Sequence, residues 1–422
     1  MKIWILVLAL TGVLAAGPTE SREWTATNGK TVEGSVLRIE GDKAVLKRAD
    51  GPEVKVPLSL FVEGDRKLLH EHFGIEAGGN ATASGAAAAE GLPFEQGEVV
   101  GPVDAGDGAT YYLYLPKSLK AERKAPLLFY TDAGGGSPRQ LQGIREGAEV
   151  CGWVTAISVE SKNGESVEHN KRVSKACVDH ILETLPVDGD RLYFTGNSGG
   201  GAMSMFNVDE LKGAGGMPNI GYIPQGCDPP KGHYYVLSGG SDFNRYLSAH
   251  IGKKFGKDAV HRMHPGGHDG GPQSMRVDGM IWLNARFLEE ERRDHAEEAL
   301  DFEAAVIAMI RDLAGKEPHR AYSMARVLKD DYAISGANLG VVDALLGELG
   351  AEPDNVRYHE GLLAIDEFSE DEFAEFGEGG GSKMGHADPK VTRKAEALAE
   401  KYQGVPMIED TFKAMAKPTV GG

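Results

Sequence analysis

Hydrophobic and polar residues alternate with a period of two near the N-terminus. The alternation runs along residues 32–39 and continues through Val54, Val56 and Leu58. Asn28-Gly29 and Asp50-Gly51 separate these segments, and such pairs between alternating segments are the strongest short-range signal of a β-hairpin. A helical stretch follows at residues 65–73. We therefore predict a small SH3-like β-barrel of three or four short strands over residues 22–75.

A change of pattern marks a domain boundary. Residues 76–92 are mostly Ala, Gly and Ser, which is typical of a linker. From residue 93 to about 290, continuous apolar segments alternate with helical ones, and this favours a mostly parallel sheet with helices on both faces, of the α/β class. Strands are expected at 111–115, 126–130, 153–159, 191–195, 221–224 and 233–237, and helices ending near 148 and over 167–185.

The last part of the chain, residues 291–422, has only helical patterns. Phe302, Val306, Met309 and Leu313 share one helix face, and Gly315 is placed to end that helix. We expect a helical C-terminal region that packs on the α/β domain, and we find no motif for chemistry in it. Further helices are expected at 319–329, 339–349, 388–402 and 407–416.

The N-terminus has the pattern of an export signal. Lys2 is followed by an uncharged apolar run over residues 3–16, with small residues at Ala15 and Ala16. The run is shorter than the roughly 20 residues that a membrane-spanning helix needs. We expect residues 1–16 to be a signal peptide that is removed on export to the bacterial periplasm or medium. An uncleaved membrane anchor is the alternative.

Net charge and cysteine usage exclude several kinds of partner. A formal charge of −18 argues against nucleic acid and against anionic membrane surfaces. The three cysteines, Cys151, Cys177 and Cys227, allow one disulfide and one free thiol, and we interpret all three as structural. The three cysteines form no CxxC pair and have no histidine near them at zinc-finger spacing, so we expect no metal site at them. We also expect that the chain needs no metal and no cofactor.

The strongest chemical motif is Gly196-Asn197-Ser198-Gly199-Gly200. It fits G-x-S-x-G and lies between the apolar segment 192–194 and a helix that begins near Gly200. In such a motif the strained strand-to-helix turn exposes the serine hydroxyl, and the helix N-terminus stabilises developing negative charge. The motif predicts that Ser198 is a nucleophile.

A nucleophilic serine needs a base and an acid that orients it, and in this type of sheet they follow in the order Ser, acid, His. Asp242 comes just after the strand at 233–237 and is the predicted acid, with Asp228 and Asp258 as alternatives. His268, which follows Gly266-Gly267 in a loop, is the predicted base. The competing histidines are His264 and His261.

A second glycine-rich loop, residues 131–137, supplies candidate donors for an oxyanion. Glycines let several backbone N–H groups converge on one point. We expect the N–H of Gly199 and the N–H of Ala133 or Gly134 to bind the oxyanion. A phosphate site is disfavoured because no Gly-Lys-Ser/Thr sequence follows the glycines.

Five motifs between residues 93 and 290 carry a resemblance to a known family. They are Tyr112-Leu113-Tyr114-Leu115-Pro116, Leu127-Leu128-Phe129-Tyr130, Gly134–Gly136, Gly196-Asn197-Ser198-Gly199-Gly200-Gly201-Ala202-Met203 and Pro265-Gly266-Gly267-His268. Through them residues 93–290 resemble the polyhydroxybutyrate depolymerase and feruloyl esterase branch of the α/β-hydrolases. The resemblance implies a serine esterase that hydrolyses a small-molecule ester through an acyl-enzyme. Asp132 stands where that family usually has histidine, and the short segment between Ser198 and Asp242 implies an open site.

The N-terminal β-unit also carries a resemblance, through Arg22-Glu23-Trp24-Thr25, Gly29-Lys30, residues 41–47 and Val56-Pro57-Leu58. Through these segments it resembles the Sla homology (SHD1-like) domain. That resemblance implies a peptide or protein partner for this unit.

Two other functions stay open for the whole chain. One is an inactive hydrolase-fold scaffold that binds proteins. The other is a serine peptidase, since fold alone does not separate peptidase from esterase.

Overall fold

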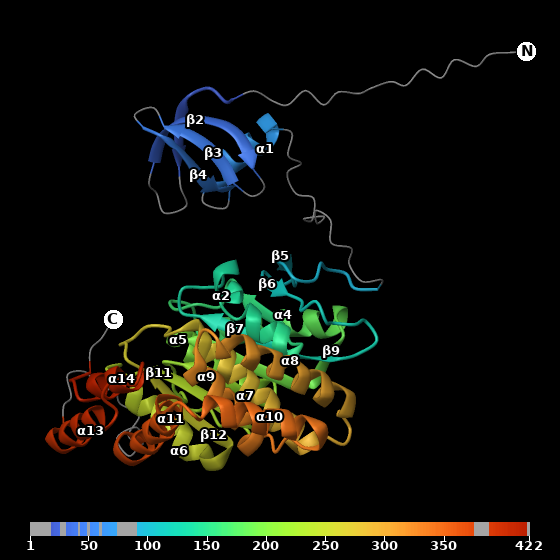
Figure 1. Cartoon of the computed structure of the whole chain (residues 1–422). Helices are drawn as coiled ribbons and strands as arrows, with labels where there is room; N and C mark the ends of the chain where they lie inside the picture. The colour runs from blue at the N-terminus through green and yellow to red at the C-terminus, as the bar shows by residue number, and fades with distance from the viewer. Residues whose placement is uncertain are drawn as a thin grey trace, which may run out of the picture. The chain divides into compact units, whose positions relative to one another are not determined.

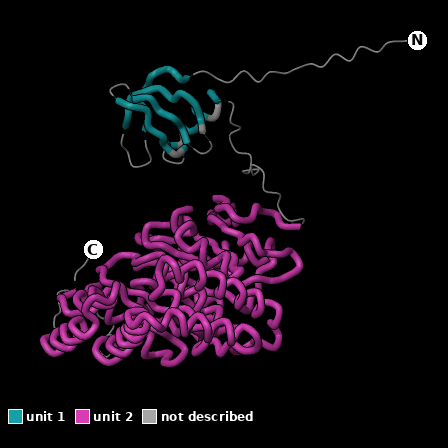
Figure 2. Tube along the Cα trace, viewed as in Figure 1, with its two compact units in different colours: residues 1–84 teal, residues 85–422 magenta. Residues whose placement is uncertain are grey.

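The chain divides into two compact units, residues 1–84 and residues 85–422 (Figure 2). The structure is a computed structural model that describes residues 18–25, 31–40, 43–48, 51–58, 61–73, 91–374 and 388–419. The predicted signal peptide and nearly all of the predicted linker lie outside these residues, as do the Asn28-Gly29 turn and Asp50.

The first unit is a four-stranded antiparallel sheet in sequence order, followed by one helix (Figure 1). The N–H of Val62 donates to the carbonyl of Thr25 at 2.9 Å, which brings the segment after the last strand back to the first strand, as in an SH3-like barrel. Trp24, Val36, Leu46, Phe61 and Leu69 are buried together in its core. The elements are β1 (Arg22–Thr25), β2 (Thr31–Glu40), β3 (Lys43–Arg48), β4 (Glu53–Pro57) and α1 (Glu63–Phe73).

The second unit is built on an eight-stranded sheet in the order β12-β11-β10-β9-β7-β8-β6-β5. The six strands from β8 to β12 in this order pair in parallel, and β6 and β5 extend the sheet with antiparallel pairs. The predicted α/β-hydrolase sheet is therefore confirmed. The strands are β5 (Val99–Asp104), β6 (Thr110–Tyr114), β7 (Ala125–Asp132), β8 (Val154–Ser158), β9 (Val187–Asn197), β10 (Gly215–Asn219), β11 (His233–Gly239) and β12 (Ala259–His264).

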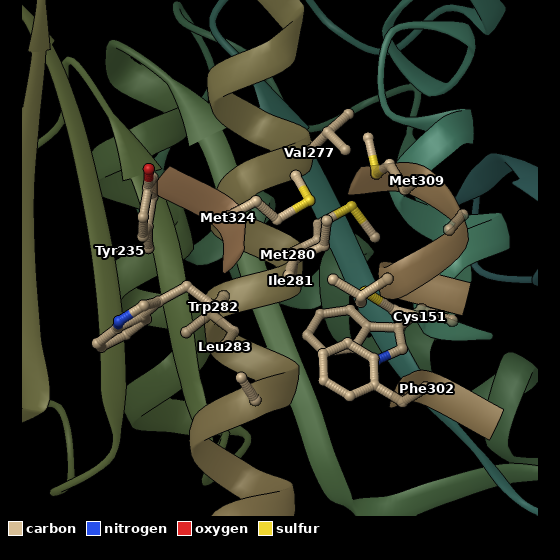
Figure 3. Close-up of a cluster of buried hydrophobic side chains, with 14 of the residues drawn as sticks. Cys151, Tyr235, Val277, Met280, Ile281, Trp282, Leu283, Phe302, Met309 and Met324 are labelled. Carbon is tan, nitrogen blue, oxygen red and sulfur yellow. The ribbon is translucent and has the colours of Figure 1, made fainter. Parts of the chain in front are cut away.

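Two hydrophobic cores cover the two faces of this sheet because neighbouring residues of a strand point to opposite faces. In β7, Leu128 and Tyr130 pack in one core, and Leu127 and Phe129 pack in the other. Figure 3 shows the first core, in which side chains of α7 meet Phe302 and Met309 of the C-terminal region. The helices of this part are α2 (Pro138–Gln142), α3 (Arg145–Cys151), α4 (Val167–Thr184), α5 (Gly199–Glu210), α6 (Arg245–Phe255) and α7 (Gln273–Glu291).

The C-terminal region is helical, as predicted, and belongs to the same compact unit as the sheet. Helix α8 packs against α3, and α11 and α14 pack against β12. Figure 1 shows α11 beside β12. None of the helices in the described ranges is long and apolar enough to cross a membrane. The region comprises α8 (Ala296–Ala314), α9 (Pro318–Arg326), a π-helical turn (Val327–Asp331), α10 (Gly336–Leu349), α11 (Pro353–Glu372), α13 (Pro389–Lys401) and α14 (Ile408–Met415).

The strand predicted at 221–224 is wrong. The strand at this point of the sheet is β10, Gly215–Asn219, whose sequence Gly-Gly-Met-Pro-Asn has neither the apolar run nor the alternation that indicates a strand. Its glycines are required by close packing, since a Cβ on Gly215 would lie 2.0 Å from the carbonyl oxygen of His233. Sequence reasoning also missed β5, β12 and α11.

We expect the stability of the second unit to depend on pH through the buried side chain of His261. His261 lies between the hydroxyls of Ser238 and Ser369, and burial lowers its pKa from 6.5 to about 3. Below pH 6.5 the unfolded chain binds a proton at this histidine and the folded chain does not, so acid favours unfolding until about pH 3. We expect His261 to account for a loss of about 2 kcal/mol between pH 6.5 and 4.5.

The measurement is the urea dependence of unfolding for the wild type and for His261→Gln at both pH values. The variant has no group that titrates at this position and should lose less stability on acidification. An equal loss in both proteins would show that His261 is not held neutral by the fold.

Candidate active site

Ser198 occupies a sharp turn between β9 and α5. Its backbone has φ 55° and ψ −117°, a left-handed conformation that costs energy for a residue with a side chain. The N–H of Ser198 donates to the carbonyl of Asn219 at 3.0 Å, and its carbonyl accepts from Ala202 at 3.0 Å. A Cβ on either Gly196 or Gly200 would lie 2.3 Å from the carbonyl oxygen of Thr131. Close packing against β7 therefore explains the glycines on both sides of the serine.

The three residues predicted as a nucleophile, base and acid form one hydrogen-bonded chain. The Ser198 hydroxyl lies 2.7 Å from Nε2 of His268, and Nδ1 of His268 lies 3.0 Å from Oδ1 of Asp242. Asp242 is fully buried and also accepts from the N–H of Asn244 at 2.7 Å. In this arrangement the imidazole can remove the serine proton while the carboxylate holds the ring in place.

The alternative acids lie elsewhere. Asp228 is exposed, and its carboxylate lies 3.1 Å from Nζ of Lys254. The carboxylate of Asp258 lies 4.0 Å from the guanidinium of Arg286. Neither aspartate has a hydrogen bond to a histidine within the described part of the chain. Of the three candidate acids, the structure brings only Asp242 to His268.

The alternative bases are buried structural histidines. His261 is held between Ser238 and Ser369, and His264 accepts from the N–H of Gly266 through Nδ1 at 3.1 Å. Burial lowers the pKa of His264, which keeps the ring neutral. A Cβ on Gly271 would lie 2.6 Å from this ring, so His264 shapes the loop that carries His268.

The loops that carry the acid and the histidine are joined directly. Ser241 donates to the carbonyl of Gly266 from its N–H at 3.2 Å and from its hydroxyl at 3.1 Å. A Cβ on Gly239 would lie 2.1 Å from the carbonyl oxygen of Gly267. The N–H of Gly240 donates to the backbone carbonyl of His264 at 2.8 Å. These contacts fix the spacing between Asp242 and His268.

The C-terminal region contacts the loop that carries Asp242. The buried guanidinium of Arg245 donates to the carbonyls of Gly240 and Lys417 and lies 4.5 Å from the ring centre of Phe373. Burial lowers the pKa of this guanidinium. A Cβ on Gly240 would lie 2.9 Å from the side chain of Ala414 in α14. The helical region, in which the sequence showed no chemistry, is thus part of the scaffold of the site.

An aromatic ring and an exposed amide that the sequence did not single out flank the site. The ring of Phe243 stacks on His268 with 4.3 Å between ring centres. The N–H of Asn163 donates to the carbonyl of Ala133 at 2.9 Å, and its side-chain oxygen would lie 2.0 Å from a Cβ on Gly199. Phe243 thus packs on the candidate base, and Asn163 lies beside Gly199, the residue after Ser198.

The predicted oxyanion loop follows β7, as expected, but one of its two candidate donors is engaged. The N–H of Gly134 donates to Oδ1 of Asp132 at 3.0 Å, and the N–H of Gly135 donates to the carbonyl of Asp132 at 3.0 Å. Among described residues, the N–H of Ala133 has no such acceptor. Ala133 is therefore the better candidate beside Gly199, which is the first residue of α5.

The cysteines are not part of the site. All three are buried and free, so the disulfide that the sequence left open is absent among them. Burial raises the pKa of Cys177 and of Cys227 to about 12, which keeps both thiols protonated and unreactive. Within the described ranges, no group of three or more His, Cys, Asp or Glu side chains is placed to hold a metal ion.

Comparisons with known proteins give a likeness of fold. No family model matches the chain, and no curated protein matches it. The fluorophosphonate-binding serine hydrolase F of Staphylococcus aureus is 12% identical over 42% of this chain and 92% of that chain, with a TM-score of 0.36. Esterase 2 of Thermogutta terrifontis is 18% identical over 47% and 96%, with a TM-score of 0.35.

A third solved structure, Est1E from Butyrivibrio proteoclasticus, is 15% identical over 41% of this chain and 91% of that chain, with a TM-score of 0.33. At such identities and scores we transfer no residue role and no substrate from these proteins. The function of the chain is therefore inferred from the geometry of its site.

Proposed function

We propose that this protein is a serine hydrolase that cleaves carboxylic esters, with Ser198 as nucleophile, His268 as base and Asp242 as the acid that orients the base. The observation that carries the proposal is the continuous chain of hydrogen bonds through these three side chains, with the serine held at positive φ. A strained serine in hydrogen-bonding contact with a histidine is the geometry that nucleophilic catalysis requires.

The reaction takes two steps. His268 removes the hydroxyl proton as Ser198 attacks the ester carbonyl, and the N–H groups of Gly199 and Ala133 bind the oxyanion that forms. The protonated His268, stabilised by Asp242, then gives its proton to the leaving alcohol, and an acyl-enzyme remains. Water, activated by His268, attacks the acyl-enzyme and releases the acid and free Ser198.

Esters are preferred to amides in this proposal because of the sequence resemblance to the polyhydroxybutyrate depolymerase and feruloyl esterase branch. The intact chain of three groups supports an active enzyme over an inactive scaffold. We also propose, from the sequence alone, export through residues 1–16 and a peptide or protein partner for the SHD1-like unit. These two proposals do not depend on the chemistry at Ser198.

The test of substrate class compares p-nitrophenyl butyrate with the p-nitroanilide of the same acid. We expect kcat/KM for the ester to exceed that for the anilide by at least about 10³-fold. The reason is that expulsion of the amine from an anilide depends far more on proton donation by a general acid. Comparable rates on both compounds would favour the peptidase, and no turnover of either would favour the scaffold.

A further inference from the structure

A chain of polar side chains links the three loops of the site. Asn197 donates from Nδ2 to Oδ2 of Asp132 at 3.0 Å and accepts from Nδ2 of Asn219 at 2.8 Å. Asn219 also donates to the carbonyl of Gly270 at 3.0 Å. At the other end, Oδ1 of Asp132 accepts from the N–H of Gly134. The chain runs from the oxyanion loop, past the residue before Ser198, to the loop of His268.

We propose that Asp132, Asn197 and Asn219 form a positioning network that holds the oxyanion loop, Ser198 and the His268 loop at fixed spacing, and that this network, with asparagine at position 197, requires a carboxylate at position 132. The inference rests on the proposed function. It assigns a role to Asp132, the residue that departs from the histidine usual in the resembling family. None of the three side chains touches the reacting atoms in this proposal, so they are positioning residues.

The direction of the hydrogen bonds explains why position 132 needs a carboxylate. The chain ends in two groups that only accept, the Asp132 carboxylate and the Gly270 carbonyl. Between them, each amide can face only one way, with Nδ2 of Asn197 toward Asp132 and Nδ2 of Asn219 toward Asn197 and Gly270. The backbone of Asn219 also accepts the N–H of Ser198 at 3.0 Å, which ties the network to the nucleophile.

While residue 197 is asparagine, no rearrangement of the network accommodates an amide at position 132. Its oxygen must face the N–H of Gly134, so its NH₂ faces Nδ2 of Asn197. Turning Asn197 over places its NH₂ against Nδ2 of Asn219, and turning Asn219 over places its oxygen against the Gly270 carbonyl. Every arrangement has one contact between like groups, at a partly buried site where an unpaired polar group is costly.

The test is Asp132→Asn, assayed with p-nitrophenyl butyrate. We expect kcat to fall about 10- to 100-fold with KM little changed, since a shift of the oxyanion loop affects the transition state and not the bound ester. Asp190→Asn, at an exposed position of β9, is the matched control and should retain the wild-type kcat. A kcat for Asp132→Asn equal to that of the control would overturn the proposal.

The double variant Asp132→Asn/Asn197→Asp exchanges the two side chains and restores every hydrogen bond. The new amide accepts from Gly134 and donates to the new carboxylate, which also accepts from Asn219. We expect the double variant to recover at least about tenfold of the lost kcat, whereas Asn197→Asp alone opposes two carboxylates and stays impaired. A double variant no better than either single variant would contradict the network.

Hydrogen exchange tests the network without reference to activity. In Asp132→Asn, we expect faster amide exchange both in residues 132–136 and in residues 266–271, since the network joins these loops. Faster exchange confined to 132–136 would mean a local role only and would overturn the proposal. If the wild type itself turns over no ester, the proposed function fails, while this exchange measurement still decides on the network.

Discussion

Replacing Ser198 with alanine is expected to lower kcat for p-nitrophenyl butyrate by about 10⁵- to 10⁶-fold, because the variant has no nucleophile for the acyl-enzyme route. The residual kcat of the variant is the rate that the oxyanion donors and substrate binding provide without the nucleophile. Alanine adopts positive φ no less readily than serine, so the strain at this position, with φ 55°, is retained and the fold should be unchanged.

The matched control is Ser166→Ala. Ser166 caps α4, where its hydroxyl accepts from the N–H of His169 at 3.1 Å, and it lies on the exposed surface. Its loss should reduce stability by about 1 kcal/mol and leave kcat unchanged. If Ser198→Ala retains more than about one hundredth of the wild-type kcat, the nucleophile is another residue.

Replacing Gly200 with alanine is expected to destabilise the second unit by about 3 kcal/mol or more. The new Cβ would lie 2.3 Å from the carbonyl oxygen of Thr131 and 2.7 Å from Cα of Asp132. Both atoms are backbone of β7, which is paired with β8 and β9 and cannot move away without breaking a ladder at the middle of the sheet. Urea unfolding followed by tryptophan fluorescence measures the change.

Gly315→Ala is the control for this substitution. Gly315 ends α8 with φ −87°, and a Cβ there meets no atom within 4 Å. Because alanine restricts the unfolded chain more than glycine does, this variant should be neutral or more stable by up to about 1 kcal/mol. Equal stability of Gly200→Ala and Gly315→Ala would show that the backbone around Ser198 adapts more easily than its packing indicates.

The sequence was sufficient for the sheet and for the turn at Ser198, and it singled out Asp242 and His268, which the structure places in one hydrogen-bonded chain with Ser198. Each of these has a strong local signal: continuous apolar strands for the sheet, paired glycines around the serine, and a glycine pair before the histidine. The structure then joins Ser198, His268 and Asp242 by hydrogen bonds, although Asp242 follows Ser198 by 44 positions in the chain, with α5, β10 and β11 between them.

The rest depends on contacts between segments distant in sequence. The strand β10 has two glycines and a proline in five residues, so neither periodicity nor propensity indicates it. Asn219 gains its place in the site only because β10 lies beside β9 in the sheet. Arg245 likewise belongs to no sequence motif. Its role follows from the structure, in which its guanidinium donates to the carbonyl of Gly240 and α14 packs against Gly240.

The most direct test of Ser198 as the nucleophile is the site at which a fluorophosphonate probe reacts. The probe forms a covalent adduct only with a serine whose neighbouring base has activated it. We expect one adduct per wild-type chain, located on Ser198 by peptide mass spectrometry, and no adduct in Ser198→Ala. An adduct on a different residue, or a wild-type protein that does not react, would show that Ser198 is not an activated nucleophile.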